Sequence, residues 1–320
     1  MKLTIGIPTF NRDNEVMALV SKIMQFIISS NLQREVEVLI SSNGTKEDTV
    51  TYLMQLKNES NLRIIINDKN LGYDLNVLNI INNTKSSYLL LMSDDDLISE
   101  DLIRSLISVI DNLKSDHLII CNQNLYENNF QNLVGQEQFF KDLEKNKSYR
   151  LDELKLNSEF FGGISGLVLP VQRIKSLDLK KFVGTNWIQL AICFELIKNI
   201  PIMVPSKGEV RYSLNNRNRV WKILTNNISI RYVYKNYLDL DKSFINYGYS
   251  KYDRAVRSDT YNFRDLERIN CRFYFRGLDL RDLKHSLQAF LLYIYFSLGR
   301  YLFIFKFFIR KHFYLLTKPK

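Results

Sequence analysis

Cysteine, proline and glycine are all scarce in this chain of 320 residues, which contains 3 cysteines, 5 prolines and 12 glycines. The cysteines, Cys121, Cys193 and Cys271, are odd in number and far apart, and no CxxC pair or Cys/His metal spacing occurs. This pattern indicates reduced thiols rather than a disulfide framework or a zinc site, and it favours a cytoplasmic protein. With so few prolines and glycines, we expect no long flexible linker.

The sequence also lacks the features of a secretory signal. Met1-Lys2-Leu3 leads directly into a β-branched, apolar run, without a basic segment followed by an apolar one. The apolar stretch before Arg300 is shorter than the roughly 20 residues that a membrane-spanning helix needs. We therefore expect a chain that is neither secreted nor inserted across a bilayer.

Acidic residues are absent after Asp282, although the whole chain has 44 Lys and Arg against 34 Asp and Glu. Seven of the ten excess positive charges follow that residue: Lys284, Arg300, Lys306, Arg310, Lys311, Lys318 and Lys320. Because the rest of the chain is nearly neutral, a nucleic-acid partner is not expected. Large apolar side chains separate the basic ones, which favours a membrane-contacting tail over residues 284–320. The alternative is a helical hairpin packed on the rest of the protein.

Apolar residues recur in a pattern that alternates between strands and helices. Strands are expected at Lys2–Ile7, Val36–Ser41, Leu62–Ile66, Tyr88–Met92, His117–Cys121 and Gly163–Leu169, and helices at Asp13–Ser29, Leu75–Ile81, Asp101–Leu113 and Asn186–Ile197. This order predicts an α/β fold, a mostly parallel, Rossmann-like sheet with helices on both faces. We expect Asn122–Ser158 to be irregular, and no strand from Arg211 onward.

Polar clusters follow four of the expected strands, where such sheets bind ligands. They are Thr9–Arg12, Ser41–Gly44, Asn67–Asn70 and Ser93–Asp96. In the last, three consecutive carboxylates repel one another, and a divalent cation with hard oxygen ligands relieves that repulsion. The alternative is that Asp94–Asp96 cap the helix that begins near Ser99.

Taken together, the four clusters resemble glycosyltransferase family 2, whose members have the GT-A fold and invert the transferred sugar. The matching segments are IPTFNR at Ile7–Arg12, SSNGT at Ser41–Thr45 with Asp48, NLGY at Asn70–Tyr73 with Asn76, and SDDDL at Ser93–Leu97. Within that family the sequence is most similar to abequosyltransferase-like enzymes of bacterial surface polysaccharide synthesis. The resemblance covers roughly the first two hundred residues.

The resemblance implies a donor site for a nucleotide sugar. Residues assigned to the base, ribose and diphosphate are Pro8, Thr9, Asn11, Arg12, Ser42, Asn43, Asn70, Gly72, Asn76, Asp94 and Asp95. A UDP-sugar is expected. However, Ser42 stands where many relatives have an Asp that binds uracil, so another base stays open. Mn²⁺ or Mg²⁺ is expected at Asp94 and Asp96, with Asp95 on ribose or metal. The alternative for Asn70, Gly72 and Asn76 is an ordinary turn and helix start.

The catalytic base departs from the family pattern, which places an Asp in a Glu-Asp pair before a helix. The corresponding place holds Thr185-Asn186-Trp187, and Asn186 cannot accept a proton. Asp178 is the candidate substitute. Gly163, Ser165 and Trp187 resemble the acceptor segment, with a tight strand entry and a core aromatic as the alternatives. Arg217 and Arg219 stand where relatives close a loop over the diphosphate, and a solvated basic face is the alternative.

The resulting hypothesis is a GT-A catalytic domain at 1–210, a helical extension at 211–283 and the basic tail at 284–320. It would transfer a sugar to a saccharide or polyprenyl-linked acceptor at the inner face of the cell membrane. One alternative is a nucleotidyltransferase, although IPTFNR is not the Gly-rich basic signature expected near its first strand. The other alternative is a nucleotide-sugar-binding protein without catalysis.

Overall fold

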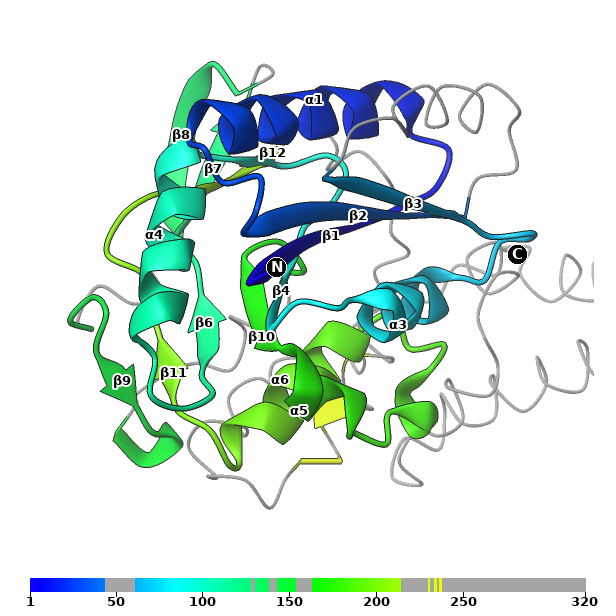
Figure 1. Ribbon diagram of the computed structural model, residues 1–320. Coiled ribbons are helices and arrows are strands. Elements are labelled where there is room, and N and C mark those ends of the chain that lie inside the picture. Colours follow the sequence, from blue (N-terminus) through cyan, green and yellow to red (C-terminus); the bar gives the residue numbers. More distant parts are fainter. Residues whose placement is uncertain are drawn as a thin grey trace, which may run out of the picture.

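The computed structural model describes residues 1–43, 61–127, 130–137, 143–153 and 163–213, together with Ile230, Val233, Tyr234, Asn236 and Tyr237. Within these ranges the chain is an α/β structure in which helices cover both faces of a central sheet (Figure 1). The expected fold class is therefore confirmed.

The central sheet has eight strands in the order β3-β2-β1-β4-β10-β6-β11-β9. These are β1 (Leu3–Thr9), β2 (Val36–Ser42), β3 (Leu62–Ile66), β4 (Tyr88–Leu91), β6 (Leu118–Ile120), β9 (Ser148–Tyr149), β10 (Leu167–Pro170) and β11 (Ile202–Met203). Strands β3, β2, β1 and β4 are parallel, and β10 runs antiparallel between β4 and β6. The four parallel strands therefore end on the same edge of the sheet.

The alternation of side chains along the strands produces two hydrophobic cores. Leu3, Ile5 and Ile7 of β1 pack with helices α1 (Asp13–Ser29) and α4 (Glu100–Asn112). On the opposite face, Leu89 and Leu91 of β4 pack with α3 (Tyr73–Asn83), α5 (Val171–Lys175) and α6 (Ile188–Ile197). Figure 1 shows the two helical layers on either side of the sheet.

Gly6 allows α3 to approach β1 closely. A Cβ at this position would lie 2.5 Å from Ile80 Cγ2 and 2.7 Å from Leu89 Cδ1, which is closer than real Cβ contacts allow. The absence of a side chain therefore sets the distance between α3 and the sheet. The first turn of α3 consequently lies near the ends of β1 and β2.

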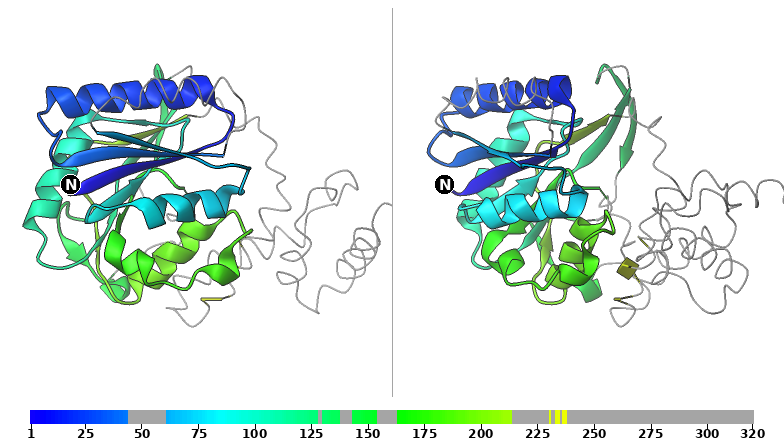
Figure 2. Two further views of the ribbon diagram at one scale, coloured as in Figure 1. Left: turned by 45° about the vertical axis from the view of Figure 1, so that its right-hand side comes forward. Right: turned by 90° about the vertical axis from the view of Figure 1, so that its right-hand side faces the viewer.

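A second sheet of four strands, in the order β5-β12-β7-β8, was not expected from the sequence. Its members are β5 (Leu97–Ile98), β7 (Gln123–Glu127), β8 (Asn132–Glu137) and β12 (Val210–Ser213). Figure 2 shows the β7–β8 hairpin standing apart from the main sheet. Two predictions were therefore wrong: 122–158 is not wholly irregular, and a strand continues past Arg211. Leu133 and Val134 are about half exposed, so β8 lacks the alternating pattern that marks a half-buried strand.

The expected boundary at residue 210 falls inside β12, and most of the chain beyond it lies outside the described residues, including Arg217, Arg219 and the basic tail. Gly44 and Asp48 lie outside them as well. Short 3₁₀ helices complete the described chain at η2 (Leu151–Glu153) and η4 (Lys180–Phe182). Among the helices in the described ranges, none combines the length and apolar character required to cross a membrane.

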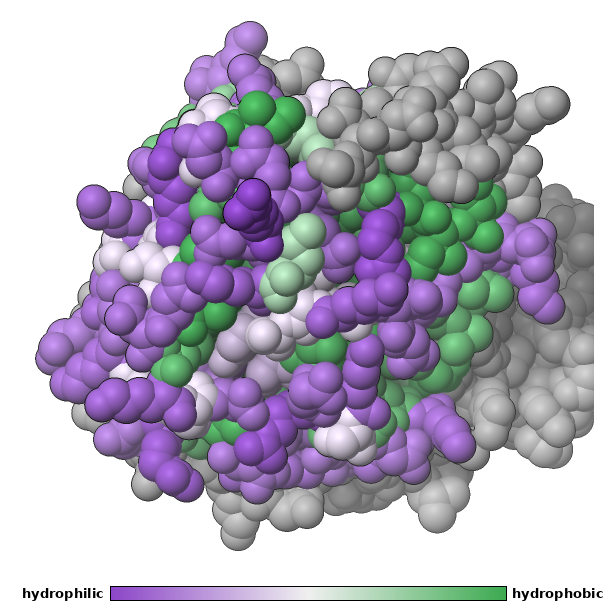
Figure 3. Space-filling view, viewed as in Figure 1, coloured by the Kyte–Doolittle hydropathy of each residue, from purple (hydrophilic) through white to green (hydrophobic). Residues whose placement is uncertain are grey.

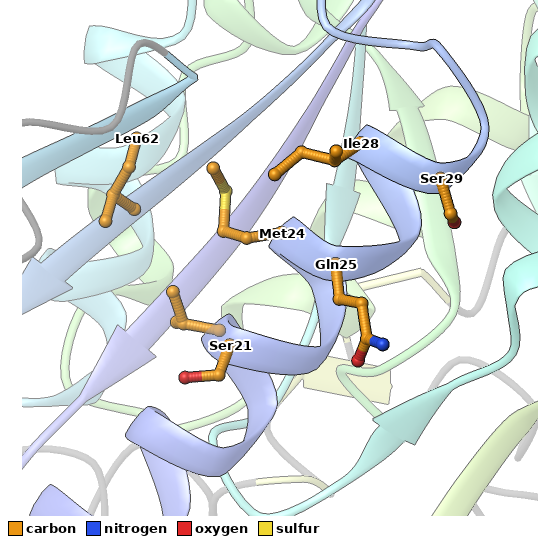
Figure 4. A pocket seen from close by; sticks show the side chains of 7 residues that line it. Ser21, Met24, Gln25, Ile28, Ser29 and Leu62 are labelled. Atoms are coloured by element: carbon orange, nitrogen blue, oxygen red, sulfur yellow. The ribbon is translucent and has the colours of Figure 1, made fainter.

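A pocket of about 440 Å³ lies between the C-terminal half of α1 and the start of β3. Met24 and Ile28 point toward the side of Leu62, whereas Gln25 and Ser29 lie on the other side of the helix (Figure 4). The face of the molecule in Figure 3 is mostly hydrophilic, with apolar side chains gathered near β3. Among the described residues no titratable side chain lines the pocket, which lies toward the sheet edge opposite to the polar strand ends. It is therefore not a candidate for the chemical site.

Candidate active site

The ends of β1, β2 and β3 lie at one level, as the sequence predicted. Thr9 pairs with Ser42, and Ser42 pairs with Ile66, in the parallel register of the three strands. The backbone continues this alignment past the strands, because Asn43 N–H donates to Thr9 O at 2.9 Å. Ser93–Asp96 directly follow the neighbouring strand β4. All four polar clusters are therefore brought to one edge.

Asp94 is buried beside the end of β1. Thr9 Oγ1 donates to its Oδ2 at 2.7 Å, and the Arg12 guanidinium contacts its Oδ1. Burial raises the pKa of Asp94 to about 6, although Arg12 and the Thr9 hydroxyl act in the opposite direction by favouring the charged form. Arg12 also lies 2.8 Å from Asp95 Oδ2 and so partly neutralises two of the three carboxylates. Arg12 thus supplies an internal counter-cation.

Asp96 faces a different set of partners. Ser165 Oγ donates to its Oδ2 at 2.6 Å, and Ser213 N–H of β12 donates to its Oδ1 at 3.1 Å. Burial and the neighbouring Asp95 raise the pKa of Asp96 to about 7. Ser165 is itself buried and accepts the Ser93 N–H at 2.8 Å. Asp96 therefore fixes the second sheet and the segment before β10 against the end of β4.

Asp95 is the most exposed member of the cluster, with 16% of its side chain accessible. Its Oδ1 accepts from the Ser93 hydroxyl. The helix-capping alternative for Asp94–Asp96 is wrong, because Ser99 caps α4 and accepts from Leu102 N–H at 3.3 Å. The three carboxylates instead belong to the strand-end site.

A divalent metal fits this site through Asp95. No group of three or more His, Cys, Asp or Glu suited to a metal occurs within the ranges described. A metal shared with a diphosphate needs only one or two protein carboxylates, since Mg²⁺ retains substrate and water ligands. Asp95 keeps accessible carboxylate surface beside its contacts to Ser93 and Arg12, whereas Asp94 and Asp96, the two ligands expected from the sequence, are buried.

Buried amides connect β2, β3 and α3 below the strand ends. Asn67 Nδ2 donates to Asn43 Oδ1 at 2.8 Å and to Asn76 Oδ1 at 3.1 Å. Asn76 Nδ2 in turn donates to Ser41 O at 3.0 Å, and Asn79 Nδ2 donates to Asn67 Oδ1 at 2.8 Å. Asn67 was expected only as the first residue of the cluster Asn67–Asn70, and Asn79 was not expected at the site. The helical spacing of Asn76, Asn79 and Asn83 is the signal that marks this polar face.

The turn before α3 has a conformational reason for its glycine. Gly72 has φ of +80°, in the left-handed region, and its N–H donates to Asn70 Oδ1 at 2.8 Å. Its carbonyl accepts from Asn43 Nδ2 at 3.1 Å. Asn70 is exposed, so its described contact is that of a turn residue. Asn76, in contrast, is buried within the amide network.

Pro8 and Asn11 lie at the end of β1 and in the turn after it. Pro8 is half-buried and pairs with Ser41, and Asn11 has φ of +54°. Asn11 Oδ1 is buried, and the described part of the chain offers it no hydrogen-bond partner. Ser42 is fully buried. The turn between Pro8 and Arg12 therefore presents one side-chain acceptor without a described partner, Asn11 Oδ1, next to the carboxylate cluster.

Gly163 and Ser165 lie against the second sheet. Tyr212 Oη donates to Ser165 O at 2.8 Å, and Gln123 Nε2 donates to the same oxygen at 3.2 Å. A Cβ at Gly163 would clash with the Tyr212 hydroxyl, and Gly166 has φ of +89°. The segment before β10 approaches β12 closely, which explains why its residues are small. Tyr212 and Gln123 were not expected from the sequence.

Asn186 and Trp187 form the loop before α6, while Asp178 lies apart from it. Asn186 has φ of +61°, and Trp187 Nε1 is buried with no acceptor among the residues described. Asp178 is exposed, and its Oδ1 accepts Lys180 N–H at 3.3 Å at the start of η4. Within the described part of the chain, no hydrogen bond or ion pair connects Asp178 to the strand-end cluster.

The family model described as "Glycosyl transferase family 2" matches residues 4–167, just over half of the chain. No curated protein matches the chain significantly. Among solved structures, S. aureus TarS 1-349 in complex with UDP is similar with 13% identity and a TM-score of 0.59, covering 88% of this chain and 82% of that one.

Two further structures share the fold. TarS 1-349 in complex with UDP-GlcNAc has 13% identity and a TM-score of 0.60, covering 87% of this chain and 80% of that chain. The mannosyltransferase PcManGT from Pyrobaculum calidifontis, in complex with GDP-Man and Mn²⁺, has 8% identity and a TM-score of 0.53. That match covers 94% of this chain and 81% of PcManGT. At these identities the similarity shows a shared GT-A-like architecture.

Proposed function

The chain belongs to glycosyl transferase family 2, glycosyltransferases that use nucleotide-sugar donors, and on that basis we propose inverting transfer of a hexosyl or deoxyhexosyl group to a saccharide or polyprenyl-linked acceptor. The observation that carries the proposal is the strand-end cluster, in which Asp94, Asp95 and Asp96 meet Thr9 and Arg12. A carboxylate and a guanidinium that are both partly exposed suit a bound nucleoside diphosphate and its metal. The role in surface polysaccharide synthesis at the inner face of the membrane is part of this proposal.

We assign the donor to the strand ends at Pro8, Thr9, Asn11, Ser42 and Asn43. A UDP-sugar is the proposed donor, because TarS binds UDP and UDP-GlcNAc, while PcManGT binds GDP-Man and leaves another base open. Asn11 Oδ1 supports the assignment as a buried acceptor without a described partner, ready for a donor group of the base or ribose.

Mn²⁺ or Mg²⁺ is the proposed cofactor, held through Asp95. When bound, such an ion stabilises negative charge on the leaving diphosphate. The protein residues have separate tasks. Arg12 reduces the repulsion between the carboxylates of Asp94 and Asp95 by pairing with both, and Thr9 orients Asp94. Asp96 anchors Ser165 and β12, which places the proposed acceptor segment beside the donor end.

The proton acceptor is proposed to be Asp178, since Asn186 has no basic oxygen. Asp178 is exposed, so an acceptor hydroxyl can approach its carboxylate. Binding without catalysis is the second candidate, and the Asn at position 186 is the observation in its favour.

The donor assignment is tested by thermal unfolding of the full chain with a panel of nucleoside diphosphates and nucleotide sugars, each with and without Mn²⁺. A ligand that binds only the native state raises Tm, and the rise grows with the logarithm of the ligand concentration relative to its Kd. We expect UDP and UDP-sugars to raise Tm more with Mn²⁺ than without it. A larger shift with guanine nucleotides would correct the base, and no shift with any member would contradict the donor site.

A further inference from the structure

Asp74 is a buried carboxylate that joins two parts of the chain more than a hundred residues apart. Only 2% of the residue is exposed. Its Oδ2 accepts Gly184 N–H at 2.7 Å and Asn186 N–H at 2.8 Å, and its Oδ1 accepts Ile188 N–H at 3.2 Å. Helices α3 and α6 lie on the same face of the sheet, which makes this connection direct (Figure 1). The donor site as proposed does not include this residue.

The loop over residues 184–188 needs this carboxylate to keep its shape. Helix α6 begins at Ile188 without a side-chain cap of its own, so its first N–H groups need an outside acceptor. Gly184 and Asn186 both have positive φ, at +92° and +61°. For Asn186 this conformation is unfavourable and persists only when its surroundings hold it. The negative charge of Asp74 also interacts favourably with the N-terminus of α6.

The same turn of α3 reaches the donor side. Asn76, two residues after Asp74, donates to Ser41 O at 3.0 Å, and Gly72 O accepts from Asn43 at 3.1 Å. A second contact to α6 is made by Tyr73, whose hydroxyl donates to Gln189 Oε1 at 3.1 Å. Residues 72–76 therefore contact the ends of β2 and the loop before α6 at once.

We propose that Asp74 is a positioning residue for glycosyl transfer, which holds the loop carrying Thr185-Asn186-Trp187 in a fixed relation to the donor site. This rests on the proposed function. Asp74 does not touch the substrate, because its carboxylate is enclosed by the loop. Its effect reaches the reaction through the backbone of Asn186 and the side chain of Trp187.

The charge on Asp74 gives the proposal a pH signature. Burial raises the pKa of Asp74 to about 6, and the backbone N–H groups of the loop lower it. Across the surrounding elements, Tyr73 on α3 and Gln189 on α6 are the polar neighbours, and the lysine Lys181 of η4 lies over the Phe182 ring instead. In the described part of the structure no ion pair includes Asp74. Protonation therefore removes charge from the carboxylate that accepts the N–H groups of Gly184, Asn186 and Ile188.

Trp187 provides a measurement that does not depend on activity. The chain has two tryptophans, so in a Trp221→Phe background the fluorescence reports on Trp187 alone. We compare acrylamide quenching of Trp187, from pH 8 to pH 5, in that background and in Asp74→Asn. An Asn side chain replaces one acceptor oxygen by an NH₂ donor, which leaves one of the loop N–H groups without a partner.

The matched control is Glu37→Gln, which neutralises another buried carboxylate. Glu37 accepts from Thr4 at 2.8 Å and pairs with Arg63, which donates to Asn83 O at the C-terminal end of α3, the end opposite to Asp74. For Asp74→Asn we expect increased quenching at pH 8 and no transition near pH 6. We also expect kcat to fall on the order of 10- to 100-fold from misplacement of the loop, with the Kd for UDP changed less than about threefold.

Unchanged quenching and an unchanged pH profile in Asp74→Asn would overturn the proposal, as would the same effects in Glu37→Gln. If Asp74→Asn does not fold, quenching of the parent protein decides alone, and the absence of a transition near pH 6 counts against the proposal. A parent protein that shows the quenching transition but turns over no donor would contradict the proposed function and leave the loop's dependence on Asp74 intact.

Discussion

Asp74, Asp94 and Asp96 are buried carboxyls whose pKa burial raises to about 6, about 6 and about 7. A raised pKa means that the native state holds the proton more tightly than the unfolded chain does. Such a group stabilises the fold when protonated, and this contribution is lost as the pH rises through the native pKa. Each carboxylate is nevertheless kept in contact with donors that favour its charged form. These buried carboxylates, when charged near neutral pH, therefore reduce the free energy of unfolding.

The variant Asp74→Asn is also expected to change how the free energy of unfolding depends on pH, which is measured separately from the order of the loop. The pKa of Asp74 rises from 3.8 to about 6 on folding, so its contribution to the free energy of unfolding falls by about 3 kcal/mol between pH 4 and pH 7. The variant lacks this slope, and its stability relative to wild type should increase as the pH rises. Urea denaturation at several pH values measures the difference. A difference that does not vary with pH would show that Asp74 titrates normally.

Asp178→Asn tests the proposed proton acceptor. Loss of a general base lowers turnover by about 100-fold or more, and donor affinity should not change because Asp178 has no described contact with the donor end. Single-turnover kinetics and UDP binding, measured in parallel, distinguish the two effects. Wild-type turnover would remove Asp178 from the reaction and leave the loop before α6 without a protein base.

At the scale of elements, the contact between β1 and α3 determines where the first turn of α3 lies. Gly6→Ala should lower the free energy of unfolding by about 1–3 kcal/mol, because the added methyl overlaps Ile80 and Leu89. Gly135→Ala is the matched control, since a Cβ there would make an ordinary contact of 3.6 Å with Leu125. Denaturation of both variants checks the prediction. Equal stabilities of the two would mean that α3 can move away from the sheet without a penalty.

Six strands of the main sheet were predictable because they are short apolar runs, and four of these end in a polar cluster, whereas the two-residue strands β9 and β11 were not predicted. Leu62–Ile66 and Asp13–Ser29 were predicted with the bounds that the structure has. The β7–β8 hairpin was not, because polar residues occupy it and Leu133 and Val134 face solvent together. Its pairing with β12 depends on the register between segments 87 residues apart, as in the pair of Gln123 with Val210. Local periodicity contains no information about such a contact.

The candidate site was predictable only in part for a similar reason. Position after a strand identified Thr9, Asn43 and Asp94, which the structure brings together. Ser165 donates a hydrogen bond to Asp96, which lies 69 residues away in the sequence, and Asp74 accepts one from Asn186, which lies 112 residues away. Buried polar pairs of this kind have no periodic pattern, so they were recognisable only from the folded chain.

For the whole molecule, the basic residues after Asp282 are expected to determine membrane attachment rather than donor binding. Truncation after Asp282 should leave UDP binding unchanged, because the proposed donor site is formed by strand ends before Leu97. The full chain should float with vesicles containing anionic lipid, and less so at high salt, because salt screens attraction to headgroups but not apolar insertion. Flotation of both forms at low and high salt checks this. Equal flotation would return the tail to packing within the protein.

The proposed function requires that the protein turn over a nucleotide-sugar donor with the help of the strand-end carboxylates. The most direct measurement is the release of nucleoside diphosphate from nucleotide sugars with Mn²⁺, compared among wild type, Asp95→Asn and the control Asp101→Asn, an exposed residue in the first turn of α4. We predict metal-dependent release by wild type and Asp101→Asn, with a loss of about 100-fold or more in Asp95→Asn. Equal release by Asp95→Asn, or no release from any donor, would contradict the account.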